Sequence, residues 1–239
     1  MIVKDIRHTP HQTPVSAARD EALASTVWQL PQLPASTSLS FVVVPDFLNY
    51  ARLLSTGQAK AMLALAGGVS RVTKAALNVA PLILANPRRA VAQDFWLIAE
   101  ALTRYDLALL PRGRATVSCL HSYLTDFALV FDRAEFVQRF AQLARKRGSW
   151  GLWTQQPAMA LSACVRWGVT PDYLVVLLSS QAQDALDALR LARENKHFER
   201  TRILADLTNF PQTVQADPRA CVAEPGLFDG FVIAGSSAE

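Results

Sequence analysis

The residues best suited to chemistry follow short apolar runs. His121 comes directly after the run ATVSCL at 115–120, and it is the only histidine inside the apolar core pattern. An imidazole can act as acid, base or metal ligand near neutral pH. Asp126 follows in the same loop, which strengthens a catalytic interpretation of His121. The competing interpretation is a partly buried histidine that hydrogen-bonds a neighbouring loop.

Two further carboxylates stand at the ends of apolar runs. Asp46 follows LSFVVV at 39–44, and Asp206 lies within RILADL at 202–207. A carboxylate there can orient a histidine, take a proton or bind a divalent metal, although Asp also caps helices and turns. We expect Asp46, His121, Asp126 and Asp206 as catalytic candidates. If Asp46, His121 and Asp206 converge, their oxygen and nitrogen atoms suit a divalent metal.

Neutral polar groups and arginines supply the remaining candidates. Gln and Thr side chains can recognise a hydroxyl, amide or carboxyl group, and an arginine can bind a substrate anion. All are equally common as ordinary loop residues. The substrate-binding residues we expect are Arg88, Arg112, Thr154, Gln155, Ser179, Asn209 and Ser236.

Missing motifs exclude several enzyme classes. No lysine stands at the end of an expected strand, which disfavours Schiff-base aldolases and pyridoxal phosphate enzymes. The chain contains neither GxGxxG nor GxxxxGK[ST], so no nucleotide-binding motif is present. HExxH, GxSxG and CxxC are absent too. Cys119 precedes His121 by two residues and would share its strand face, either as a thiolate–imidazole pair or as part of one packed wall.

The elements that must position these residues alternate between short apolar runs and helical segments. Near-continuous, β-branched runs are typical of parallel strands buried on both faces. Eight such runs predict an α/β (β/α)8-type barrel with an N-terminal extension. If 81–85 and 107–110 are helical instead, six strands remain, and an open doubly wound parallel sheet becomes the better description. The expected strands are 39–44, 81–85, 107–110, 115–120, 150–154, 173–178, 202–207 and 228–234.

Two stretches carry a resemblance to a known superfamily. The sequence GSWGLWTQQPAMALSACVRWGVTPDYLVVLLS resembles the later half of aldolase-type (β/α)8 barrels, in which a strand ending in a polar residue leads into a helix. The terminal LFDGFVIAGSS resembles the last strand of such barrels, where a Gly-Ser step often binds phosphate. The resemblance covers about the last 100 residues, and it implies the barrel fold without a catalytic signature.

Composition limits the class of protein. The chain has 239 residues, 51% of them hydrophobic and 18% charged, which excludes intrinsic disorder as the main state. The net charge of +4 is spread thinly, without the basic stripe of a nucleic-acid-binding protein. Three cysteines without a CxxC pair fit a reducing compartment. We expect a cytoplasmic protein with no secretory signal and no transmembrane segment.

The chain divides into an N-terminal extension at 1–36, rich in Pro, Thr, Gln and Ser, and one α/β domain at 37–239. Within that domain, 59–84 is long, apolar and rich in alanine. Such a helix indicates either an interface, hence a homo-oligomer or a partner protein, or a helix buried beneath the extension.

Three functions compete on these observations. The first is a small-molecule enzyme of lyase, isomerase or hydrolase type that acts on a polar or anionic substrate at a strand-end His/Asp site. The second is a non-catalytic partner subunit or pseudoenzyme that docks through 59–84. The third is a Rossmann-like domain that binds a cofactor other than a dinucleotide, which requires an open sheet.

Overall fold

The fold is described from a computed structural model. It covers the residue ranges 2–5, 27–29, 40–45, 69–109, 116–177, 183–207 and 224–234.

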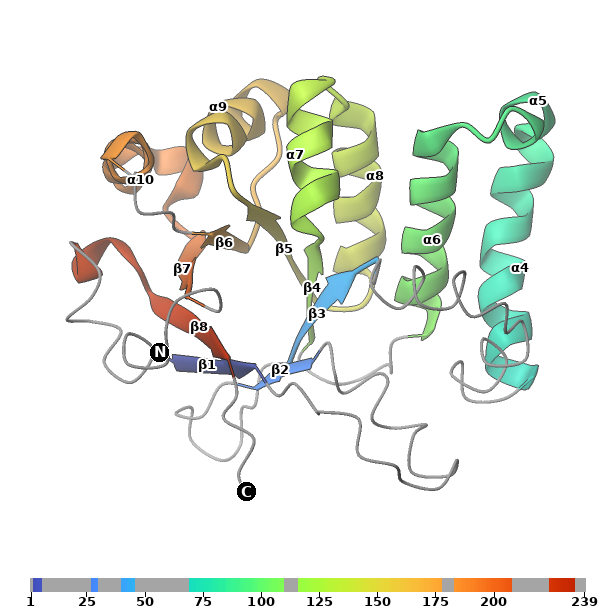
Figure 1. Ribbon diagram of the computed structural model, residues 1–239, viewed down its shortest axis with the longest axis horizontal. Coiled ribbons are helices and arrows are strands. Elements are labelled where there is room, and N and C mark those ends of the chain that lie inside the picture. The colour runs from blue at the N-terminus through green and yellow to red at the C-terminus, as the bar shows by residue number, and fades with distance from the viewer. Residues whose placement is uncertain are drawn as a thin grey trace.

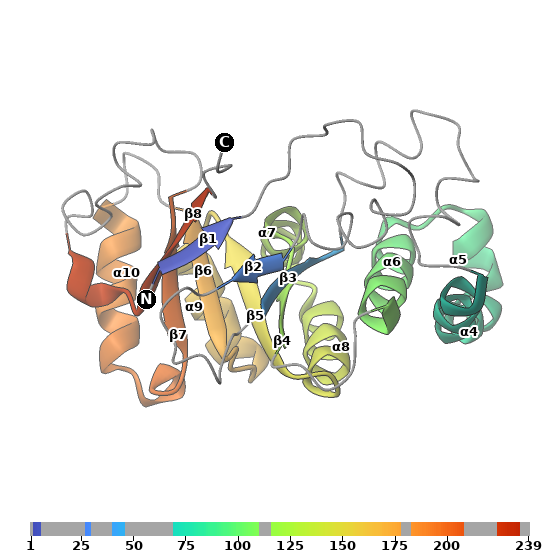
Figure 2. The same ribbon diagram turned by 90° about the horizontal axis from the view of Figure 1, so that it is seen from below.

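Six parallel strands form one curled sheet. Each strand pairs with its neighbours in the sequence, so the order across the sheet is the chain order. Figure 1 shows the sheet as a half-barrel, an arc with its helices on the convex side. In Figure 2 the arrowheads of β3, β5 and β8 point to the same side, as parallel strands require. The strands are β3 (Ser40–Val44), β4 (Thr116–Leu120), β5 (Ser149–Thr154), β6 (Tyr173–Leu177), β7 (Arg202–Asp206) and β8 (Gly230–Ala234).

Two short strands span the open side of the half-barrel. β1 (Ile2–Asp5) pairs parallel to β8 and antiparallel to β2 (Val27–Gln29), and β2 pairs antiparallel to β3. Both lie in the predicted N-terminal extension, so part of that segment belongs to the sheet (Figure 1). A (β/α)8 barrel needs eight parallel strands, each followed by a helix. The protein is therefore an α/β half-barrel, and the prediction of a closed (β/α)8 barrel is wrong.

Two predicted strands are helical. Residues 81–85 end helix α4 (Val69–Ala85), and 107–109 end α6 (Phe95–Leu109). Each apolar run continues a longer segment of helical periodicity, and a helix of 15 or 17 residues outweighs the local β preference of its last turn. Leu82 is buried while Leu84 is 78% exposed, as expected for one-sided packing of a helix. The other six predicted strands are confirmed.

Further helices connect the parallel strands. They are α5 (Pro87–Val91), α7 (Ser122–Val130), α8 (Ala134–Arg145), α9 (Pro157–Trp167) and α10 (Gln183–Glu194), with the short 3-10 helices η1 (Lys196–Phe198) and η2 (Pro225–Leu227). The strand order never reverses from β3 to β8. A doubly wound sheet requires such a reversal, and Rossmann-like domains bind their cofactors there. The doubly wound alternative is thus wrong for this sheet, and the third functional hypothesis loses its structural basis.

The core has two layers, one on each face of the sheet. On the convex face, strand residues such as Leu120, Trp150 and Leu152 pack against the helices. On the concave face, strand residues pack on one another. This second cluster consists of Val117, Cys119, Tyr173, Val175, Leu204 and Val232, with Val43 and Trp153 at its edge. Alternation along each strand therefore determines whether a side chain faces the helices or the inside of the half-barrel.

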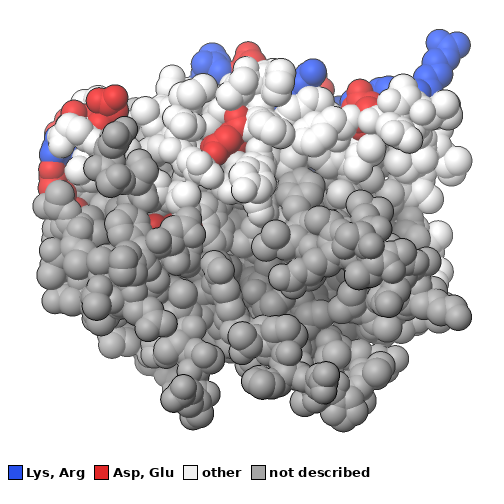
Figure 3. Space-filling view, in the orientation of Figure 1, with Lys and Arg blue, Asp and Glu red and all other residues white. Residues whose placement is uncertain are grey.

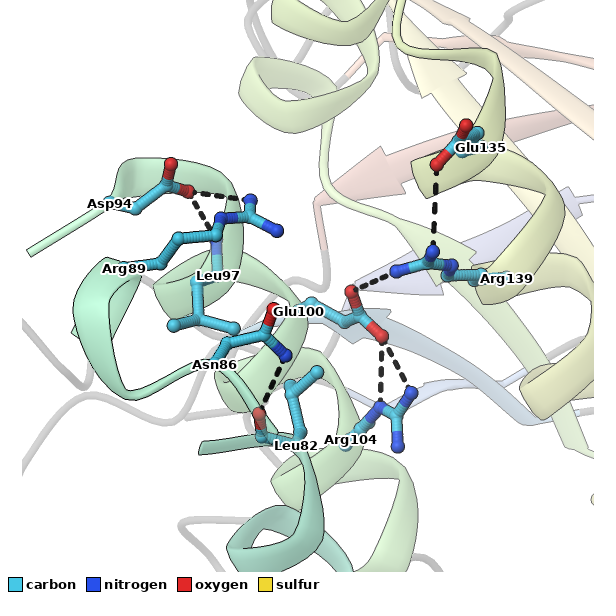
Figure 4. Close-up of polar contacts among 9 residues, drawn as sticks. All are labelled: Leu82, Asn86, Arg89, Asp94, Leu97, Glu100, Arg104, Glu135 and Arg139. Atoms are coloured by element: carbon cyan, nitrogen blue, oxygen red, sulfur yellow. Dashed lines mark hydrogen bonds and ion pairs between the residues drawn. The ribbon is translucent and has the colours of Figure 1, made fainter. Parts of the chain in front are cut away.

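A network of ion pairs joins α6 to α8 (Figure 4). Glu100 of α6, with 9% of its side chain exposed, accepts hydrogen bonds from Arg104 at 2.6 Å and from Arg139 of α8 at 3.1 Å. Arg139 also contacts Glu135, whose side chain is 85% exposed. Since Glu100 is buried and bonded to two guanidinium groups, it holds α6 against the half-barrel.

We expect Glu100→Gln to lower the free energy of unfolding by about 1–2 kcal/mol. The change removes the negative charge between two arginines and preserves the size of the side chain. Both arginines are partly exposed, so water limits the loss. Chemical denaturation measures the effect, with Glu135→Gln as the control, for which we expect a change within about 0.5 kcal/mol. Equal changes in the free energy of unfolding for the two substitutions would show that burial of Glu100 does not strengthen its ion pairs.

The surface seen in Figure 3 carries charges of both signs, and on the described part they gather mostly along the edge formed by the helices. No helix in the described ranges is long and apolar enough to cross a membrane.

Candidate functional site at the carboxyl ends of the strands

The carboxyl ends of the parallel strands form one rim of the half-barrel and carry three polar or aromatic residues. Cys119 of β4 faces inward and pairs with Gly151 of β5. Trp153 lies two residues further on in β5 and so shares this inner face. His121 directly follows β4, and its ring lies 5.1 Å from that of Tyr123. Asp206 follows the inward-facing Leu204 of β7 by the same interval. The carboxyl ends of the strands thus carry His121, Trp153 and Asp206, of which Trp153 and Asp206 contact each other.

A hydrogen bond links two of these residues across β6. The indole Nε1 of Trp153 donates to Oδ2 of Asp206 at 3.0 Å, and Asp206 is only 2% exposed. A buried carboxylate is costly unless it is hydrogen-bonded. Trp153 therefore fixes the orientation of a carboxylate at the carboxyl end of β7, which is where α/β enzymes place catalytic groups.

His121 sits between β4 and α7. Its backbone N–H donates to the carbonyl of Val44 at 2.9 Å, which extends the pairing of β4 with β3 beyond the strand. Its Nδ1 accepts a hydrogen bond from the backbone N–H of Tyr123 at 3.2 Å, so His121 caps the start of α7. An accepting Nδ1 requires the neutral tautomer with its proton on Nε2. In this tautomer the Nε2–H group is a hydrogen-bond donor, and the lone pair of Nδ1 is already occupied by Tyr123.

The concave face below the rim is filled. Cys119 is buried, and burial raises the pKa of its thiol. A thiol kept protonated in this way is a poor nucleophile. This burial favours simple packing of Cys119 in the core over a thiolate–imidazole pair with His121.

Asp126 bonds to the loop that follows β5. Its Oδ1 accepts from the hydroxyl of Thr154 at 2.5 Å, and its Oδ2 accepts from the backbone N–H of Gln155 at 3.2 Å. The Thr154 hydroxyl in turn accepts from the N–H of Gln156 at 2.9 Å. Three of the sequence-predicted residues, Asp126, Thr154 and Gln155, are thus brought together. Their bonds anchor the β5–α9 loop to α7.

The contribution of Asp126 to the free energy of unfolding depends on pH. Burial raises the pKa of Asp126 despite the opposing hydrogen bonds from Thr154 and Gln155. A carboxyl with a raised pKa binds more protons in the folded than in the unfolded state, so its contribution to stability falls as pH rises. We expect the neutral variant Asp126→Asn to gain stability relative to the wild type as pH rises from about 3.8 through the raised pKa. Thermal unfolding across this range measures the difference, and a relative loss by the variant would contradict the expectation.

The remaining predicted residues divide into two groups. Arg88 is exposed in α5, and because the preceding 81–85 segment is helical, Arg88 does not follow a strand. The reason for assigning it to the substrate site is therefore removed. The other residues lie outside the described ranges: Asp46, Arg112, Ser179, Asn209 and Ser236.

Within the described ranges, no three His, Cys, Asp or Glu side chains gather as ligands for a metal ion. The predicted ligand set includes Asp46, which is outside those ranges. A divalent metal accordingly stays a prediction from the sequence.

Trp153 is the site residue that the sequence analysis missed. The sequence pattern makes it part of an apolar strand, whereas the register places Gly151 opposite the inward-facing Cys119 and so turns Trp153, two residues on, to the same inner face. The available signal was its position as the last inward-facing residue of β5, directly before the polar Thr154-Gln155-Gln156.

Comparison with known proteins finds no relative: no protein-family model, no curated protein and no solved structure matches this chain. The aldolase-type resemblance therefore extends only to the class of fold, a parallel α/β sheet curled into a half-barrel.

Proposed function

We propose that the protein is a small-molecule enzyme whose substrate binds at the carboxyl-end rim of the half-barrel. The supporting observation is the buried carboxylate of Asp206, held by the indole of Trp153. In this proposal Asp206 is a general acid or base, and Trp153 is its positioning residue. In the same proposal His121 donates a hydrogen bond to the substrate through its Nε2–H group. The reaction class is that of a lyase, isomerase or hydrolase acting on a polar substrate.

A ligand screen by thermal unfolding tests this proposal. The panel contains sugar phosphates, hydroxy acids and amino acids, and each compound is tested on the wild type and on Asp206→Asn. A ligand at about 100 times its dissociation constant stabilises the folded state by roughly 2.7 kcal/mol. For a chain of this size that corresponds to a rise in Tm of about 5–11 °C.

We expect at least one compound class to stabilise the wild type and to lose that effect in Asp206→Asn. Asp132→Asn serves as the matched control, because Asp132 also accepts an indole hydrogen bond, from Trp167, on the outer surface with 66% of its side chain exposed. A ligand that stabilises the wild type and Asp206→Asn equally would overturn the assignment of the site.

A second candidate function rests on α4. Leu77 and Leu84 on this helix are 65% and 78% exposed, and α4 packs mainly against α6. These observations favour docking through 59–84, either to a second copy or to a partner protein, as a non-catalytic subunit would use it. Sedimentation velocity of the wild type and of Leu77→Ser/Leu84→Ser tests the homo-oligomer: an unchanged monomer in both would remove it.

A further inference from the structure

An exposed apolar surface runs along α6 and α7, and it adjoins the strand ends where the ring of Tyr123 lies 5.1 Å from that of His121. On α7 the exposed residues recur at helical spacing, with Tyr123, Phe127 and Val130 being 60%, 46% and 65% exposed. On α6, Phe95 and Ile98 are 46% and 43% exposed. We call the α6–α7 surface the set Phe95, Ile98, Tyr123, Phe127, Val130 and Phe131.

The two helices form one continuous surface. The rings of Phe95 and Phe127 meet edge to face, with centroids 5.8 Å apart, and Phe127 contacts Phe131 at 6.3 Å. Beneath them, Trp96 contacts both Phe95 and Phe131. The opposite side of α7 is already buried, through Leu124, Ala128 and Leu129. The exposed side of α7 is therefore a second apolar face, which packing within the described part of the chain leaves uncovered.

The acidic residues that border this surface already have partners. Asp94, Asp132 and Glu135 pair with Arg89, Arg166 and Arg139, and Asp126 of α7 accepts hydrogen bonds from Thr154 and Gln155. Arg133 differs, because its guanidinium lies over the ring of Trp96 at 5.5 Å and forms no ion pair within the described ranges. The border thus offers one cation to an incoming acidic group.

We propose that the α6–α7 surface binds an amphipathic helix of a partner protein, with acidic residues beside its apolar face. Exposed apolar side chains at i, i+4 and i+7 of α7, extended by Phe95 and Ile98 of α6, form the type of surface on which such helices dock. Aromatic side chains dominate the binding energy of such interfaces. An acidic residue on the partner meets Arg133 at the edge of the surface.

A designed peptide of about five helical turns, ~18 residues, serves as the probe. It carries leucines at i, i+4, i+7 and i+11 with flanking glutamates, and a matched peptide carries lysines instead of the glutamates. Binding to the full-length protein is measured by fluorescence anisotropy. We expect the glutamate peptide to bind at least about tenfold more tightly than the lysine peptide.

Substitutions in the protein test where the peptide binds. We expect Phe127→Ala and, independently, Val130→Ser to weaken binding about tenfold, and Arg133→Gln to weaken binding of the glutamate peptide alone. Leu191→Ala is the control, because Leu191 is 68% exposed on α10 and should not change binding. Phe127 and Val130 are exposed enough that both variants should fold, which their Tm verifies.

Three results would overturn the proposal. The first is equal binding of the two peptides, or binding of neither. The second is a dimer in solution that Val130→Ser dissociates, which would make a second copy the occupant. The third is Phe127-dependent binding to phosphatidylglycerol vesicles that exceeds binding of the peptide, which would assign the surface to a membrane.

Discussion

Gly151→Ala is expected to lower the free energy of unfolding by about 3 kcal/mol, and hence Tm by roughly 6–12 °C. A Cβ at position 151 would lie 2.8 Å from Sγ of Cys119 and 2.8 Å from the backbone oxygen of Tyr173. The first contact is with a buried side chain on β4, and the second is with the backbone of β6. Neither can move away without disturbing a strand pairing, so the added methyl group strains the sheet.

Two controls accompany this prediction. Gly226→Ala should change stability by no more than about 0.5 kcal/mol, because a Cβ there meets no atom within 4 Å. Adding Cys119→Ala to Gly151→Ala should recover part of the loss, because it removes the sulfur but not the oxygen of Tyr173. Wild-type stability in Gly151→Ala would mean that β4, β5 and β6 are not packed as described.

We expect Trp153→Phe to lower the free energy of unfolding by about 2 kcal/mol through loss of the hydrogen bond alone. Phenylalanine fills much of the indole space but cannot donate to Asp206, whose carboxylate stays buried at the rim. A double-mutant cycle with Asp206→Ala isolates that bond, and we expect a coupling free energy of about 1–2 kcal/mol. Denaturant unfolding of the four proteins measures it.

Trp167 provides the matched control for this cycle. Its indole donates to Asp132 at 2.8 Å, but the side chain of Asp132 is 66% exposed. Water can replace that bond, so coupling between Trp167→Phe and Asp132→Ala should be no more than about 0.5 kcal/mol. Equal coupling in the two cycles would show that burial of Asp206 does not strengthen its bond to Trp153.

The parallel strands could be predicted from the sequence because their signal is local. Runs such as YLVVLL at 173–178 are apolar without interruption, as strands covered on both faces must be. The runs at 81–85 and 107–110 carry a similar local pattern, yet they complete longer helices. Four or five apolar residues do not distinguish a strand from the last turn of a helix.

The pairing of β1 and β2 with the half-barrel could not be predicted in the same way. β1 and β2 are four and three residues long, too short for a clear local pattern, and the pairing of β1 with β8 joins the two ends of the chain. The residues of the candidate site also differ in whether a local sequence signal identifies them. His121 and Asp206 were recognised from residue type at strand ends. Trp153 required the register between β4 and β5, which is a property of the folded sheet.

We propose that a small polar molecule binds beside Trp153 and Asp206. Protein labelled with 15N at its tryptophan indoles tests it most directly, since the bonded indole N–H of Trp153 gives its own NMR signal, assigned with Trp153→Phe. Compounds that stabilise the protein should shift this signal to saturation and leave the indole signal of Trp167, which donates to the exposed Asp132, unchanged. Binding at this site is contradicted if those compounds do not change the chemical shift of the Trp153 indole, or if they change only that of Trp167.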